Sequence, residues 1–173
     1  MPIRLELGAG GGLVGLGVAI GSQVDHPIHI TDQENMLSLM IQNISLNRLR
    51  SRVVPLVLNW LVTLPCIIAA NSNRNLRGEP LPSEVITEKP NVILAADCVY
   101  FEPAFPLLIS TLEELLALCP DAIIYFCFKK RRKADLHFMK TAKKKFLVEE
   151  IEDIDRPIFS REGLFLYTFK RKP

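Results

Sequence analysis

The sequence predicts an α/β fold of the Rossmann-like kind: a mostly parallel sheet of seven strands, with an antiparallel last strand and helices on both faces. Two observations carry this prediction. Apolar runs typical of buried strands alternate with helical patterns along most of the chain. The last two strands are joined by Glu152–Glu162, which shows no obvious helix, so we expect this final pair to be antiparallel.

The first element is a short strand, Ile3–Leu7, which runs directly into the glycine-rich stretch Gly8–Gly12. Glycine adopts positive φ without a side-chain clash, so a strand can stop there and restart as a helix, expected over Leu13–Gly21. Five exposed backbone amides at such a helix start would form a site for a polar or anionic ligand. Glu6 precedes the turn, and we expect its carboxylate to end the strand facing that ligand. Glycines within the helix, such as Gly15 and Gly17, suit close packing on the sheet.

The rest of the chain continues the alternation of strands and helices. Strands are predicted at residues 27–32, 53–58, 91–96, 122–128, 146–151 and 163–170, and helices at residues 34–46, 105–118 and 131–144. We expect Thr31 or Asp32 to cap the helix at 34–46. Pro55 suits an edge position, because proline cannot donate a hydrogen bond to a neighbouring strand. Residues 64–90 are predicted as a long loop, with a short helix near residues 61–70.

The composition is that of one ordinary globular domain of 173 residues with a net charge of +2. No signal peptide is recognisable, and no apolar run approaches the roughly 20 residues that span a membrane. The four cysteines lack metal-ligand spacing, which favours reduced thiols, no metal site and a cytoplasmic location, with the nucleus as an alternative. We expect a monomer. The chain begins two residues before a core strand, which we interpret as an N-terminal truncation.

Basic residues cluster in Lys129–Lys133 and again in Lys143–Lys145. Such runs most often form a solvated face or a patch resembling a nuclear-import signal. The sharper hypothesis is a docking surface for an acidic protein or an RNA-bearing complex.

The glycines alone do not distinguish two possible cofactors. Gly10, Gly12 and Gly15 also satisfy the dinucleotide pattern GxGxxG, and Asp32 lies at a distance suited to a ribose hydroxyl. Glu6 favours S-adenosylmethionine, because a carboxylate would attract the methionine ammonium and would repel a pyrophosphate. An Asp-x-x-Tyr motif after the fourth strand, Asp97 to Tyr100, and the antiparallel last strand also fit a methyltransferase better.

Several motifs together resemble the seven-strand lysine methyltransferases of family 16: Leu5–Gly15, Thr31-Asp32, Asn59-Trp60, Ala95–Tyr100 and, pointing to a subfamily, Lys129–Asp135. The resemblance extends from Ile3 to near the C-terminus and is weakest in Leu64–Pro90. It implies one S-adenosylmethionine-dependent methyltransferase domain over residues 1–173, with protein-lysine N-methyltransferase activity. Likeness to fungal members further implies translation elongation factor 1A as the protein substrate.

The resemblance also implies roles for individual residues. The cofactor-binding residues would be Glu6, Gly8, Gly10, Gly12, Asp32, Trp60 and Ala96, with the glycines along the methionine part, Asp32 on the ribose hydroxyls and Trp60 by the adenine. Asp97 and Tyr100 would shape the methyl-acceptor end. The lysine has to arrive as the neutral amine, so we assign Asp97 to orienting the ammonium or fixing the cofactor rather than to acting as a strong base. Tyr100 would add a π-face and a hydroxyl to the same channel.

The sequence departs from the family pattern in three places. We interpret the chain as lacking the N-terminal segment with its own tryptophan. Leu61 replaces the glycine usual after Trp60, and Gly11 replaces a common threonine. Simpler roles stay open: a helix cap for Asp32 or Asp97, core packing for Trp60, and a surface acid for Glu6.

Other functions stay open as well: a methyltransferase for a nucleic acid or small molecule, a non-catalytic binding module, or an NAD-dependent dehydrogenase. No motif such as Asn-Pro-Pro-Tyr follows the fourth strand to hold a flipped base, which argues against a nucleic-acid substrate.

Overall fold

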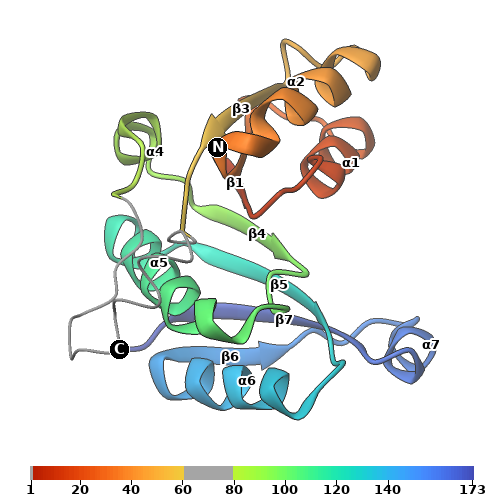
Figure 1. Ribbon diagram of the computed structural model, residues 1–173, viewed down its shortest axis with the longest axis vertical. Coiled ribbons are helices and arrows are strands. Elements are labelled where there is room, and N and C mark those ends of the chain that lie inside the picture. The colour runs from red at the N-terminus through yellow and green to blue at the C-terminus, as the bar shows by residue number, and fades with distance from the viewer. Residues whose placement is uncertain (1, 61–79) are drawn as a thin grey trace.

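The computed structural model describes residues 2–60 and 80–173, which form one seven-stranded sheet in the order β3-β2-β1-β4-β5-β7-β6 (Figure 1). The five strands from β3 to β5 pair in parallel. β7 pairs antiparallel with both β5 and β6, so it lies between them although it is last in the chain. The predicted α/β class, the mostly parallel sheet and the antiparallel last strand are confirmed.

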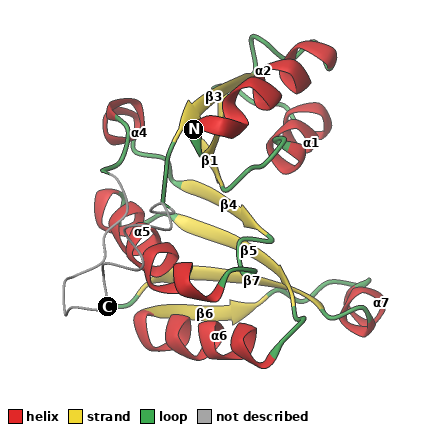
Figure 2. Cartoon of the chain, viewed as in Figure 1, coloured by secondary structure: helices red, strands yellow, loops and turns green. Residues whose placement is uncertain are grey.

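The strands and helices follow the predicted alternation closely (Figure 2). The strands are β1 Arg4–Leu7, β2 Ile28–Asp32, β3 Val53–Val57, β4 Val92–Ala96, β5 Ile123–Lys129, β6 Phe146–Glu150 and β7 Leu164–Arg171. The α-helices are α1 Leu13–Gly21, α2 Leu37–Leu46, α4 Ser83–Glu88, α5 Phe105–Leu118, α6 Lys133–Lys145 and α7 Arg156–Arg161. Two 3-10 turns, η1 Glu34–Met36 and η2 Glu102–Ala104, lead into α2 and α5.

Two hydrophobic cores lie on opposite faces of the sheet. α1 and α2 cover one face at β2 and β3, where Ile28, Ile30 and Met40 are fully buried. α4, α5 and α6 cover the other face, whose core includes Leu5, Leu7, Ile93, Leu108, Phe126, Phe138 and Phe169. Successive side chains of a strand point to opposite faces, so Glu6 lies between Leu5 and Leu7 in sequence but faces α1. Helices on both faces were predicted, and the structure confirms them.

β3 is an edge strand, as Pro55 predicted. Pro55 is opposite Ile30 in the register with β2, and its missing N–H leaves no gap in that ladder because β3 has no neighbour on its other side among the described residues.

The prediction that residues 152–162 contain no helix was wrong. α7 occupies Arg156–Arg161, with Pro157 in its first turn and Asp155 before it. An acidic residue followed by proline at a helix start is a recognised signal, but the six-residue helix buries no side chain fully, so it shows no apolar period. Arg156 fixes it to the sheet by a 2.7 Å contact with Glu150 of β6.

The predicted loop at residues 64–90 also contains a helix, α4, whose Val85 is fully buried in the larger core. Pro82 precedes it and Lys89, in the left-handed conformation, ends it before Pro90. The short helix expected near residues 61–70, and the replacement at Leu61, lie outside the described residues.

α6 lies against the β6 and β7 edge of the sheet, at the opposite end from α1 and α2 (Figure 1). Residues 129–145, which form its length and the turn before it, hold nine of the 21 Lys and Arg residues and a single acid, Asp135. Among the helices that the structure describes, none is long and apolar enough to cross a membrane.

Candidate active site

The turn between β1 and α1 has the positive φ angles that its glycines predicted. Gly8, Gly10 and Gly12 have φ values of 65°, 56° and 85°, in the left-handed region that favours glycine. A Cβ at Gly12 would stand 2.6 Å from the Ile30 side chain, whereas one at Gly10 would meet no atom within 4 Å. The turn is therefore packed against the sheet at Gly12 and open at Gly10.

Several amides of this turn donate hydrogen bonds within the protein, which leaves fewer of them for the polar or anionic ligand that the sequence predicts. Gly10 N–H donates to Asp32 Oδ2 at 2.7 Å, and Gly15 N–H donates to Glu6 Oε2 at 2.8 Å. The N–H groups of Ala9 and Gly12 donate to backbone carbonyls. The carboxylates of Asp32 and Glu6 thus accept two of these amides, so acidic side chains from β1 and β2 border the turn.

Glu6 is buried, with 2% of its surface exposed, beneath the first turn of α1. Burial raises the pKa of its carboxyl to about 7, and the hydrogen bonds from the Gly15 and Val14 amides only partly offset this effect. Glu6 therefore bonds to the helix start, while its expected position next to a ligand stays a prediction.

Asp32 ends β2 and connects it to the glycine turn. Its second oxygen accepts the N–H of Gln33 at 2.7 Å. The expected cap of the following helix was wrong for both candidates. Gln33 is the N-cap residue of η1 and makes no side-chain cap. The Thr31 hydroxyl donates instead to Glu6 O of β1, at 2.7 Å.

Sequence reasoning missed Asn43 of α2, which holds the other side of the turn. Its Nδ2 donates to Gly11 O at 2.8 Å, and a Cβ at Gly11 would stand 2.9 Å from that nitrogen. Glycine at position 11 thus leaves room for this contact. The sequence offered no distinct signal for this contact, because α2 carries other polar residues beside Asn43.

The Asp-x-x-Tyr motif follows β4 and lies beside the glycine turn, because β4 pairs directly with β1. Cys98 Sγ donates to Leu7 O at 3.3 Å, and a Cβ at Gly8 would stand 3.0 Å from this sulfur. The Trp60 indole is buried in the same place, with its Nε1 3.5 Å from that Cβ position. The structure thus brings the predicted glycines, Trp60 and the motif together.

Asp97 occupies the left-handed conformation at φ 58°, immediately after Ala96, and its N–H donates to Cys127 O at 2.8 Å. Aspartate tolerates this conformation better than most residues do. Asp97 and Tyr100 are both exposed. Partial shielding from water still raises the pKa of the Tyr100 hydroxyl, and the charges of Asp32, Cys98 and Asp97 add to the shift.

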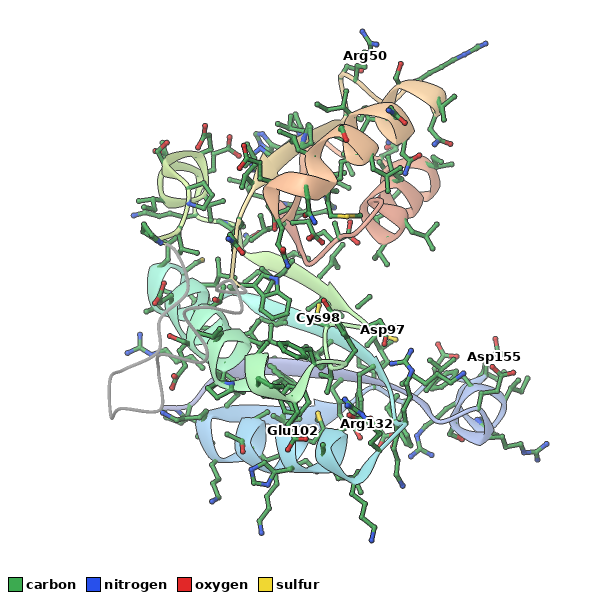
Figure 3. All side chains as sticks on the ribbon, viewed as in Figure 1. Arg50, Asp97, Cys98, Glu102, Arg132 and Asp155 are labelled. Carbon is green, nitrogen blue, oxygen red and sulfur yellow. The ribbon has the colours of Figure 1, made fainter. Side chains whose placement is uncertain are left out.

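Sequence reasoning treated the basic segment as a solvated or docking surface, but two of its side chains reach the motif. Arg131 Nη1 and Nη2 contact Asp97 Oδ1 and Oδ2 at 2.6 and 2.8 Å, a bidentate pair. Arg132 Nη2 donates to Tyr100 O at 2.6 Å. Figure 3 shows Asp97 and Cys98 at the end of β4, and Arg132 at the turn that leads into α6.

Asp135 holds these two arginines in place from within α6. It is fully buried and accepts the N–H groups of Arg131 and Arg132, both at 2.8 Å. Burial opposes ionisation of Asp135, but these bonds and the Arg132 guanidinium outweigh it, so the pKa of Asp135 is lowered. The β5–α6 turn is thus built to present Arg131 and Arg132 to the β4–α5 loop.

A glycine turn between β1 and α1, acids in β1 and at the end of β2, and β7 inserted antiparallel beside β5 define the class of Rossmann-like methyltransferases. Residues 3–145 match the lysine methyltransferase family, methyltransferase family 16, and the chain belongs to that family. The sequence prediction of this family is confirmed.

Individual proteins support the same conclusion. The chain is 36% identical over 180 residues to the protein-lysine N-methyltransferase EFM6 of Saccharomyces cerevisiae, covering 97% of this chain and 66% of the yeast protein. It is 29% identical over 150 residues to the EEF1A lysine methyltransferase 3 of Xenopus tropicalis, covering 85% of this chain and 56% of that protein. The chain therefore spans less than two thirds of the length of these relatives.

Solved structures show the same fold. An O-methyltransferase family protein from Burkholderia thailandensis superimposes with a TM-score of 0.61 at 13% identity, over 99% of this chain and 51% of that chain. At this identity the likeness shows the fold alone.

Proposed function

We propose that the protein is an S-adenosylmethionine-dependent protein-lysine N-methyltransferase. One observation carries the choice of cofactor: two carboxylates, Asp32 and Glu6, accept hydrogen bonds from the N–H groups of Gly10 in the turn and Gly15 at the start of α1. An acidic turn suits a cationic cofactor and opposes a dinucleotide pyrophosphate, so the dehydrogenase alternative is disfavoured. Membership of the lysine methyltransferase family supports the choice of reaction.

The residues of the turn fit S-adenosylmethionine in shape as well as in charge. The open side at Gly10, where an added Cβ would meet nothing within 4 Å, leaves room for a ligand directly over the turn. The residues that would hold it are Glu6, Gly8, Gly10, Gly12, Asp32, Trp60 and Ala96. When bound, S-adenosylmethionine supplies an electrophilic methyl group, which an amine can accept only through its nitrogen lone pair.

The chain's own residues then have to position the acceptor and keep water away. Asp97 and Tyr100 lie at the end of β4, next to the strand that carries the turn, and would orient the lysine side chain. Because a carboxylate stabilises an ammonium rather than deprotonating it, Asp97 acts in orientation. The fully buried Leu7 and the nearly buried Trp60 and Cys98 close the inner side of this region to water.

Elongation factor 1A is the protein substrate that we propose. The name of the Xenopus tropicalis relative specifies EEF1A as the protein on which it acts. The relation to the yeast lysine methyltransferase, at 36% identity, supports the same class of reaction.

The test is incubation of the purified protein with tritiated S-adenosylmethionine and elongation factor 1A, followed by intact mass spectrometry of the factor. We expect its mass to increase by whole methyl groups and the label to be lost to protease. Label lost only to nuclease would instead identify a nucleic-acid methyltransferase. The variant Asp97→Asn, which keeps a residue that tolerates positive φ, should reduce transfer at least tenfold with unchanged circular dichroism. Full activity of this variant would remove Asp97 from the site.

A further inference from the structure

Titratable and charged groups from several elements interact with the motif after β4, which carries Asp97, Cys98 and Tyr100. They are Glu6 of β1, Asp32 of β2, Cys127 of β5, and Arg131 and Arg132 before α6, which Asp135 of α6 holds in turn. Burial raises the pKa of the Cys98 thiol, and the charges of Asp32, Glu6 and Asp97 add to this rise. The field of the Asp97 carboxylate, taken alone, favours the charged form of a lysine that enters here.

This field opposes the reaction that we propose, because methyl transfer needs the neutral amine. An opposite charge within about 4–6 Å shifts a pKa by roughly 1–3 units toward the charged form. The reference pKa of lysine, about 10.4, is already far above neutral pH. A bare Asp97 would therefore hold the substrate as an unreactive ammonium.

Arg131 removes this difficulty through its position. Its guanidinium covers both oxygens of Asp97, at 2.6 and 2.8 Å. Asp135, fully buried, fixes the Arg131 backbone and pairs with the Arg132 side chain at 3.1 Å, which leaves the Arg131 guanidinium for Asp97. The pair itself is exposed, with 41% and 57% of the two side chains accessible, so it adds little to folding stability. The main effect of this ion pair is on the charge that an acceptor lysine meets.

Resting on the proposed function, we infer that Arg131 is a positioning residue that neutralises Asp97, so that the acceptor lysine can lose its proton to water in the site. A carboxylate oxygen of Asp97 then accepts a hydrogen bond from the neutral amine and orients it. The Asp97–Arg131 pair as a whole carries no net charge. Within the basic segment, Arg131 is then the one residue that takes part in the methyl-transfer site.

The test compares the pH dependence of kcat and KM for elongation factor 1A between pH 6 and 10, in the wild type and in Arg131→Gln. Loss of the arginine charge should move the acidic limb of the kcat profile up by about one pH unit, so kcat falls about tenfold at pH 7 and recovers at high pH. KM should fall at the same time, because a bare carboxylate binds the ammonium more tightly. Calorimetry without cofactor should likewise show several-fold tighter binding of elongation factor 1A.

Two further variants separate charge from structure. Arg131→Lys keeps the charge and should keep the wild-type pH profile, with a small loss of kcat from the missing bidentate geometry. Lys130→Gln removes a neighbouring charge that forms no ion pair with the described residues, and its profile should match the wild type.

The outcomes distinguish this inference from the proposed function. A wild-type protein that transfers no methyl group to elongation factor 1A would overturn both. An active wild type with an Arg131→Gln variant whose kcat is unchanged, or is lowered equally at every pH, would overturn the inference alone.

Discussion

Gly15 and Gly17 lie in the same helix two residues apart, yet a methyl group would meet different surroundings at each. At Gly15 an added Cβ would stand 2.4 Å from Ile30 Cγ2 and 2.6 Å from Glu6 Oε2, whereas at Gly17 it would meet nothing within 4 Å. The expectation of close packing was therefore right for Gly15 and wrong for Gly17. The residue type alone cannot distinguish them, because the difference depends on which side of α1 faces the sheet.

We predict opposite effects of alanine at these two glycines. Gly15→Ala should destabilise the protein by about 2 kcal/mol or more, since neither β2 nor the buried Glu6 can move away easily. Gly17→Ala should stabilise it by roughly 0.5–1 kcal/mol, because alanine is the better helix former at an exposed position. Urea denaturation of the two variants measures both values, and equal effects would contradict the packing described for Gly15.

Glu6 predicts an unusual dependence of stability on pH. Its pKa is raised by burial from 4.5 to about 7 in the folded protein. The contribution of Glu6 to stability is therefore complete below about pH 4.5 and is lost as the pH rises through about 7. At roughly 1.4 kcal/mol per pKa unit, the loss is on the order of 3 kcal/mol.

The variant Glu6→Gln tests this dependence, because its amide oxygen can still accept the Gly15 N–H. Relative to wild type, the variant should gain about 3 kcal/mol in free energy of unfolding between pH 5 and pH 8. Urea denaturation at both pH values gives the difference. A constant difference between the two proteins would show that Glu6 is ionised normally.

At the scale of elements, apolar periodicity predicted the long, well-packed ones and missed the short ones. α5 spans Phe105–Leu118 as predicted, because eight of its residues are buried at helical spacing. α4 and α7 have six residues each and bury one side chain and none, so no period could reveal them. The glycine turn, Asp32 and Asp97 could be predicted because parallel strands bring their carboxyl ends to one edge of a sheet.

The contacts that complete the site could not be predicted in the same way. Arg131 lies 34 residues beyond Asp97, and its pairing depends on how the β5–α6 turn is shaped. The reciprocal hydrogen bonds of Asp135 with the turn before α6 fix that shape. Asp135 is the single acid among the nine bases of residues 129–145. This pattern predicts a helix N-terminus, but it does not predict that Asp135 bonds to both arginines before the helix.

Asp135 is expected to matter more for α6 than any ion pair on its surface. Asp135→Asn should cost about 1–3 kcal/mol at pH 7, because it weakens two buried backbone hydrogen bonds and an arginine contact. The pKa of Asp135 is lowered in the folded state, so this contribution should disappear as the pH falls through that value.

Thermal denaturation at neutral and acidic pH measures the effect of Asp135→Asn. The control is Glu113→Gln in α5, which removes an exposed 3.0 Å ion pair with Lys145 of α6. It should change stability by less than about 1 kcal/mol. If the two variants were equally stable, α6 would not depend on its buried cap.

At the scale of the whole molecule, the single tryptophan reports on the cofactor site. Trp60 is buried against Gly8, so an occupied turn should change its fluorescence. We predict that S-adenosylmethionine changes this signal to saturation and, at about 100 times its Kd, stabilises the fold by about 2.7 kcal/mol. NAD at the same concentration should do neither. Stabilisation by NAD alone would revive the dehydrogenase alternative.

The concentration of bases in α6 and the turn before it also gives the molecule a large electric dipole. Residues 129–145 contain nine bases and one acid, while the rest of the chain has 18 acids and 12 bases, so a net charge of +2 conceals two opposed regions. A protein with such a dipole turns as it approaches a charged body, and its rate of encounter depends on salt. It should therefore be retained at low salt on both cation and anion exchange resins. The basic α6 should contact the resin only on the cation exchanger.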